Sequence, residues 1–208
     1  MSKKDEMTTA ELATRHAEKM KIRKDSQDKK LADKTIEKGL LIVHTGTGKG
    51  KSTAAFGMAM RAVAHGMKVG IVQFIKGPWH SGERDILAKF PDQVEILAIG
   101  EGFTWETQDR ERDIAVTRSS WDKAKAMIAD PAIRMVVLDE LNIALRYDYL
   151  PLDEVLAVIA ARPADKHVIV TGRNAKPEMV EAADLVTEMT LVKHPFRAGV
   201  KAQAGIEF

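Results

Sequence analysis

Residues 40–53 read LLIVHTGTGKGKST and combine a short apolar run, a loop rich in glycine and lysine, and a Ser-Thr pair. The apolar run is typical of a strand buried in a parallel sheet. Glycines allow the following loop to curl so that its backbone N–H groups surround anionic oxygens. A helix that begins near Lys51 would add its positive dipole end. Strand, loop and helix in this order are the context that a phosphate-binding loop requires.

This loop is a variant of the general pattern Gly-x-x-x-x-Gly-Lys-Ser/Thr, because Thr45 stands where the first glycine is expected and Gly46 follows it. It also has a second lysine, Lys49. We expect Lys51 to reach phosphate oxygens and the hydroxyl of Ser52 to bind Mg²⁺. The alternative, a glycine-rich turn with chance lysines, is disfavoured by the strand before the loop and the helix after it.

An acidic pair supplies the second half of the expected site. Residues 136–140 read VVLDE, an apolar strand that ends in Asp139 and Glu140. A carboxylate at the end of a strand beside a phosphate loop is placed to contact a metal ion, directly or through water. The sequence does not choose between the two acids. Together with the loop, the pair predicts a site for a nucleoside triphosphate and Mg²⁺, but it does not define the reaction.

The rest of the chain alternates between strand-like and helix-like segments. We expect strands at 40–44, 68–75, 94–99, 134–139, 167–171 and 185–192, and helices at 51–65, 82–90, 109–129, 152–161 and 177–183. Strands separated by helices predict a mostly parallel sheet of about six strands covered on both faces. The predicted fold class is therefore α/β, a three-layer sandwich of the P-loop NTPase type with an N-terminal helical arm.

Composition narrows the function further. The chain has 208 residues, a formal net charge of +2 and no cysteine, which excludes disulfides, a thiolate nucleophile and cysteine-ligated metals. The near-balanced charge argues against a nucleic-acid coat, and neither a membrane span nor a signal peptide is apparent, so a cytoplasmic protein is expected. Residues 1–38 carry 11 basic and 8 acidic residues without glycine, proline or aromatics. We expect them to form a charged helical arm, and 39–208 to form the catalytic domain; the arm is either solvated or ordered by a partner subunit or ligand.

Several further segments are distinctive as an ordered set. They are VQFIKG at 72–77, GFTWET at 102–107, VLDEL at 137–141, YDYL at 147–150, TGR at 171–173, VKH at 192–194 and GVKAQ at 199–203. With the phosphate loop, they closely resemble the P-loop class of corrinoid adenosyltransferases (ATP:cob(I)alamin adenosyltransferases) from about residue 39 to residue 208. Thr47 is a small departure, since that position is often Asn in the family.

The resemblance implies transfer of the 5′-deoxyadenosyl group of ATP to the cobalt(I) of a corrinoid, with triphosphate as leaving group. It implies Mg²⁺ or Mn²⁺, a homodimer whose N-terminal helix covers the partner's site, and a flavoprotein reductant. The implied residues, by role, are these. The resemblance assigns metal contact to Ser52 and Glu140, and corrinoid binding to Phe103 and Trp105. It assigns a catalytic role to Lys51. It assigns ATP binding to Gly46, Thr47, Gly48, Lys49, Gly50, Lys51, Ser52, Thr53 and Arg173. Arg173 is about as well explained by a surface ion pair.

The two aromatic residues are expected to displace the lower ligand of the cobalt, which eases its reduction. Aromatic residues at i and i+2 more often simply pack in a core, and only the resemblance favours the corrinoid role for Phe103 and Trp105. His167 follows Asp165 as in cobalt-ligating motifs, but Val170 stands where those motifs need glycine, so we expect a structural role. The alternative function is a P-loop ATPase with a nucleic-acid or protein partner.

Overall fold

The computed structural model describes residues 8–75, 81–98 and 109–207. It divides into two compact units, Met1–Glu37 and Lys38–Phe208. The first unit contains helix α1 (Thr9–Ala32), which is capped by a reciprocal pair in which Thr8 accepts from the Glu11 N–H and Glu11 accepts from the Thr8 N–H. None of the residues of α1 is buried, in keeping with the sparse apolar positions of this segment.

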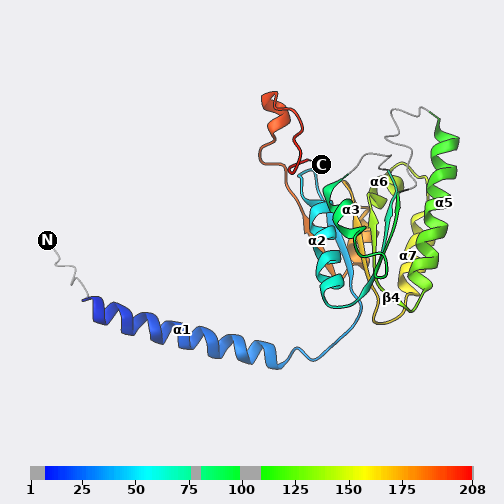
Figure 1. Cartoon of the computed structure of the whole chain (residues 1–208). Coiled ribbons are helices and arrows are strands. Elements are labelled where there is room, and N and C mark those ends of the chain that lie inside the picture. The colour runs from blue at the N-terminus through cyan, green and yellow to red at the C-terminus, as the bar shows by residue number, and fades with distance from the viewer. Residues whose placement is uncertain (1–7, 76–80, 99–108, 208) are drawn as a thin grey trace. The chain divides into compact units, whose positions relative to one another are not determined.

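The second unit is built on six parallel strands (Figure 1). They are β1 (Leu41–Thr45), β2 (Lys68–Gln73), β3 (Val94–Ala98), β4 (Ile133–Asp139), β5 (His167–Thr171) and β6 (Leu185–Glu188). Their order across the sheet is β3-β2-β4-β5-β1-β6, and every pairing is parallel. The predicted α/β fold class, with its parallel six-stranded sheet, is confirmed.

Helices cover both faces of this sheet and complete three layers (Figure 1). One face packs on α2 (Lys51–Ala64) and α3 (Gly82–Leu87), with Phe56 of α2 almost fully buried. The other face packs on α5 (Arg110–Ala129), α6 (Leu141–Arg146), α7 (Leu152–Ala160) and α8 (Pro177–Ala182). Trp121 of α5 is fully buried, and its indole N–H donates to a Glu154 carboxylate oxygen at 2.8 Å.

Several elements differ from the sequence prediction. Helix α6 was not expected, β2 ends at Gln73 rather than at 75, α3 ends at Leu87 rather than at 90, and β6 ends at Glu188 rather than at 192. β6 pairs with β1, and the pairing ends where β1 ends, with Thr45 opposite Glu188. One residue further on, the carbonyl of Met189 accepts a hydrogen bond from the N–H of Gly48 in the phosphate loop. A short 3₁₀ helix, η1 (Pro195–Ala198), follows before the C-terminal tail. Within the described residues, no helix combines the length and the apolarity needed to cross a membrane.

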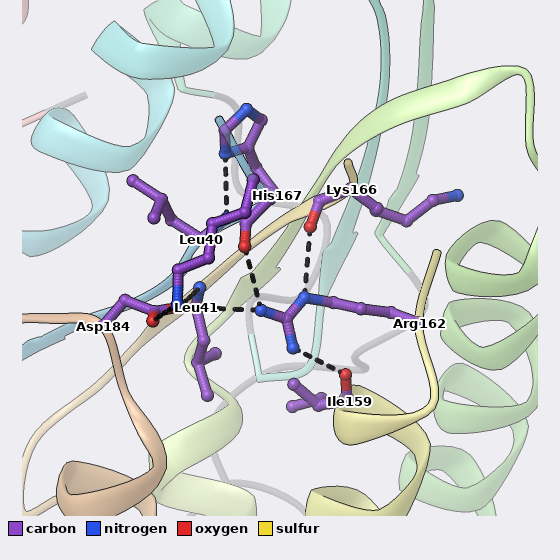
Figure 2. A network of polar contacts seen from close by, with 9 residues as sticks. Leu40, Leu41, Ile159, Arg162, Lys166, His167 and Asp184 are labelled. Atoms are coloured by element: carbon purple, nitrogen blue, oxygen red, sulfur yellow. Dashed lines mark hydrogen bonds and ion pairs between the residues drawn. The ribbon is translucent and has the colours of Figure 1, made fainter. Parts of the chain in front are cut away.

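A polar network joins chain segments at the amino-terminal ends of the strands (Figure 2). The guanidinium of Arg162 donates to the carbonyls of Ile159 at 2.8 Å, Lys166 at 3.1 Å and Gly39 at 3.2 Å. Nδ1 of His167 accepts a hydrogen bond of 3.1 Å from the backbone N–H of Leu40. His167 thus has the structural role that the sequence predicts. The carboxyl-terminal ends of the strands are where ligands bind in open α/β sheets.

Candidate active site

The phosphate loop connects β1 to α2 and lies against the chain that follows β6. Gly46 has a φ of +93°, and a Cβ at this position would lie 2.5 Å from the carbonyl oxygen of Met189. The N–H of Gly48 donates to that same carbonyl at 2.6 Å. Gly50, with a φ of +108°, is the N-cap of α2 and contributes no side chain to the helix start. The first N–H groups of this 14-residue helix are therefore presented at the loop.

Lys51 is the cation that this loop encloses. Its side chain is only 7% exposed, and its ammonium donates to the Gly48 carbonyl at 2.5 Å. Burial is the largest influence on its pKa and lowers it, while the carboxylate of Glu140 acts in the opposite direction. The positive charges of Arg173 and Lys49 lower the pKa of Lys51 further. A bound polyphosphate would supply the negative charge that stabilises these three cations together.

A cleft of about 490 Å³ opens over the loop and is lined by segments far apart in the sequence. Its lining comes from the loop and the start of α2 (Gly48, Lys49, Gly50, Lys51, Ser52 and Thr53), from the start of α3 (Ser81, Gly82 and Glu83), from Glu140 and Arg173, and from the C-terminal tail (Gly205, Ile206 and Glu207). Eight of the predicted site residues thus meet at one cleft. Gly46 and Thr47 belong to the loop but not to the lining.

The two acids at the end of β4 have different surroundings. Asp139 is fully buried, and its carboxylate accepts hydrogen bonds from the Thr171 hydroxyl at 2.8 Å and from the Gln73 amide at 3.0 Å. Glu140 is half-buried, lines the cleft and acts electrostatically on Lys51. The cleft therefore presents Glu140, whereas both oxygens of Asp139 are engaged by neighbouring strands.

The donors in this cleft suit a hard divalent cation. The hydroxyl of Ser52 and the carboxylate of Glu140 belong to residues that line the same space, and both are oxygen ligands of the kind that Mg²⁺ prefers. The described residues contain no group of three or more His, Asp or Glu that could hold a metal by themselves. Mg²⁺ commonly takes only one or two protein oxygens and completes its shell with water and phosphates. The donor set thus fits a metal ion that enters with a nucleotide.

Some residues fall outside the predicted set or outside the described structure. Phe103 and Trp105 are not among the described residues. The cleft also includes the start of α3 and the C-terminal tail, which the sequence analysis did not assign. The start of α3 could have been anticipated, because it follows β2 and so lies at the carboxyl-terminal edge of the sheet. No local sequence signal links the tail to the loop. Its contact is an ion pair between Glu207 and Lys49.

A parallel sheet with a glycine-rich loop after its first strand, a buried lysine in that loop and an acid across the cleft define a P-loop α/β protein. Comparison with known proteins identifies the family within this class. Residues 37–208 match the family model described as ATP:corrinoid adenosyltransferase BtuR/CobO/CobP. A corrinoid adenosyltransferase from Pseudomonas aeruginosa is 59% identical over 194 residues, which cover 93% of this chain and 96% of that protein.

Two other relatives agree with this match. A corrinoid adenosyltransferase from Sinorhizobium sp is 56% identical over 93% of this chain and 92% of its own, and corrinoid adenosyltransferase CobA from Salmonella typhimurium is 50% identical over 93% and 98%. Among solved structures, the KaiC-like protein PH0186 from Pyrococcus horikoshii aligns with a TM-score of 0.41 and 16% identity over 73% of this chain and 72% of its own. This chain belongs to the ATP:corrinoid adenosyltransferase family. It is an enzyme that transfers the adenosyl group of ATP to a corrinoid.

Proposed function

We propose that this enzyme joins C5′ of ATP to the cobalt(I) of a corrinoid and releases inorganic triphosphate. Cobalt(I) provides the electron pair for the new cobalt–carbon bond, and the bond between C5′ and the triphosphate oxygen breaks with its electron pair leaving on that oxygen. The observation that carries the proposal is the enclosed ammonium of Lys51 at the base of a cleft that also contains Lys49 and Arg173. A leaving group with several negative charges matches this arrangement.

The residues of the cleft would bind and orient the substrate rather than react with it. Cobalt(I) is itself a strong nucleophile, so the protein does not need to supply a base. Its tasks are to hold C5′ in line with the cobalt and to stabilise the departing triphosphate. In the proposal, the loop from Gly46 to Thr53 holds the triphosphate, Lys51 contacts its oxygens, and Arg173 adds a further contact from beyond β5.

A divalent cation, Mg²⁺ or Mn²⁺, is part of the proposal. Ser52 and Glu140 would hold it, because both residues line the cleft together with the loop lysine and both offer an oxygen ligand. When bound, the cation would neutralise part of the charge on the triphosphate. Glu140 would then be the carboxylate that contacts the cation, whereas Asp139 would remain hydrogen-bonded to the neighbouring strands.

The corrinoid side of the proposal depends on the resemblance of the sequence to the family. Phe103 and Trp105 would contact the corrinoid below its ring. The substrate would be cobalamin, cobinamide or an a,c-diamide precursor, and a flavoprotein would supply electrons. We further propose a cytoplasmic homodimer in which the arm, residues 1–38, covers the site of the partner subunit, with residues 39–208 as the catalytic domain.

The direct test incubates the purified protein with ATP, Mg²⁺ and cobalamin chemically reduced to cobalt(I), in dim light. We expect a light-sensitive alkylcobalamin and inorganic triphosphate in equal amounts. ADP and phosphate without an alkylcobalamin would instead support the alternative, an ATPase with a macromolecular partner. Omission of cobalamin is the control, because ATP should then remain intact.

A further inference from the structure

A row of buried polar side chains crosses three neighbouring strands at their carboxyl-terminal ends. Gln73 ends β2, Asp139 ends β4 and Thr171 ends β5, and all three are at most 2% exposed. The Gln73 amide and the Thr171 hydroxyl donate to the two oxygens of Asp139. Because a buried carboxylate without donors is costly, this pairing fixes the position of all three side chains.

Thr171 has a second bond that leads out of this row. Its Oγ1 accepts a hydrogen bond of 2.9 Å from the backbone N–H of Glu140. Glu140 has a φ of +63°, a left-handed conformation that a residue with a Cβ adopts only when its surroundings require it. The residue then begins α6 as its N-cap without any side-chain cap bond. The hydroxyl of Thr171 is thus a direct restraint on the peptide that turns Glu140 toward the cleft.

We propose that Thr171 is a positioning residue for the divalent cation that accompanies ATP. Its hydroxyl oxygen accepts the N–H of Glu140 and so holds that part of the backbone. The hydrogen bond that it donates keeps the Asp139 carboxylate turned away from the cleft. The inference rests on the proposed role of Glu140 as a metal contact. Residues that form hydrogen bonds to a metal ligand generally contribute about 10-fold to 100-fold to metal affinity.

The experiment measures Mn²⁺ binding in the presence of ATP and without corrinoid, by the loss of the free-ion signal in electron paramagnetic resonance. Thr171→Val keeps the shape of the side chain but removes both hydrogen bonds. We expect it to raise the Kd for Mn²⁺ by about tenfold. Thr171→Ser, which restores a hydroxyl, should return the Kd to near its original value. Glu140→Gln tests the proposed metal contact itself in the same assay.

Gln73→Met is the matched control, because it removes the other donor to Asp139 but does not touch the Glu140 backbone. It should leave the Mn²⁺ affinity nearly unchanged. If Thr171→Val fails to fold, Asp139→Asn is added to it. The valine leaves the buried carboxylate of Asp139 short of a hydrogen-bond donor, and the asparagine removes that buried charge. The double variant should show the same tenfold loss of Mn²⁺ affinity.

The outcomes separate this inference from the proposed function. If Glu140→Gln weakens Mn²⁺ binding but Thr171→Val does not, the positioning role is wrong and the metal contact stands. If Gln73→Met weakens binding as much as Thr171→Val, the effect belongs to Asp139 rather than to the Glu140 backbone. If Glu140→Gln has no effect, the proposed metal contact itself is wrong.

Discussion

Among single residues, Lys51 has the strongest physical link to the charge of the ligand. Its ammonium is enclosed by the loop and bonded to a carbonyl, so it is held in place before any ligand arrives. Lys51→Ala should weaken binding of inorganic triphosphate by about 100-fold or more, because a charge-assisted contact in an enclosed site is lost. Calorimetric titration with triphosphate measures the change.

Lys68→Ala is a suitable control for that variant. Lys68 is an exposed lysine at the opposite end of the sheet, where β2 begins, and its removal changes the net charge equally. Triphosphate binding by Lys68→Ala should stay close to that of the unmodified chain. Equal binding by both variants would mean that the loop lysine does not contact the phosphates.

His44 makes a second residue-scale prediction, on pH. It is 3% exposed, and neither ring nitrogen has a hydrogen-bond partner in the part of the chain that the structure describes. Burial lowers the pKa of His44 below 6.5. The unfolded chain therefore binds a proton more readily than the folded chain, so stability is fully present above pH 6.5 and decreases as the pH falls toward the lower, folded-state pKa.

Urea unfolding at a series of pH values between 5 and 8 tests this prediction. His44→Leu should reduce the loss of stability on acidification below pH 6.5 but leave a residual slope, because burial also lowers the pKa of His167. His65→Leu, at the exposed C-cap of α2, is the matched control for replacing a histidine by leucine. A His44→Leu slope identical to that of the unmodified chain would contradict the prediction.

At the scale of elements, hydrophobic runs and helix signals predicted all six strands and most helices, because these are encoded locally. Helix α6 was not predicted because it has only six residues. It begins after Glu140, whose backbone is in the left-handed conformation and whose side chain does not cap the helix. The residues alone did not choose between Asp139 and Glu140, and only the resemblance to the family favoured Glu140. That choice depends on hydrogen bonds from Gln73 and Thr171, which only the strand order brings beside Asp139.

Local sequence patterns gave no indication that the C-terminal tail lies at the site. Its Glu207 pairs with Lys49 of the loop, where a negatively charged ligand would also bind. A carboxylate beside an incoming polyphosphate is repelled by it. Glu207→Gln should therefore lower the Kd for triphosphate by about threefold, a change typical of a partly exposed ion pair.

The control for the tail is Glu181→Gln, an equal change of charge at an exposed position of α8 outside the cleft. The affinity of this variant for triphosphate should not change. Weaker binding by Glu207→Gln would contradict the prediction and would mean that the carboxylate helps Lys49 to contact the ligand. A Lys49→Met background provides a further check, since the effect of Glu207→Gln should be largely lost there.

At the scale of the whole molecule, the two units differ in how they are stabilised. The unit Lys38–Phe208 contains both apolar clusters that flank the sheet, whereas no residue of α1 is buried. A truncated chain should begin at Lys38 rather than after it, because the Lys38 ammonium pairs with Asp184 and the next residue, Gly39, donates to the Ala164 carbonyl. We expect this truncated chain to unfold cooperatively with nearly the same melting temperature as the full chain.

The same truncation separates nucleotide binding from corrinoid binding. Triphosphate affinity should be retained, because every described residue of the cleft lies in the unit that remains. Retention of a corrinoid should fall severalfold if the arm covers the substrate in the dimer, since an ordered cover slows dissociation. Stopped-flow dissociation of cobalamin from the ATP-bound protein measures this directly. Unchanged dissociation would identify residues 1–37 as a solvated segment, and loss of triphosphate binding would show that the remaining unit needs the arm to form its loop.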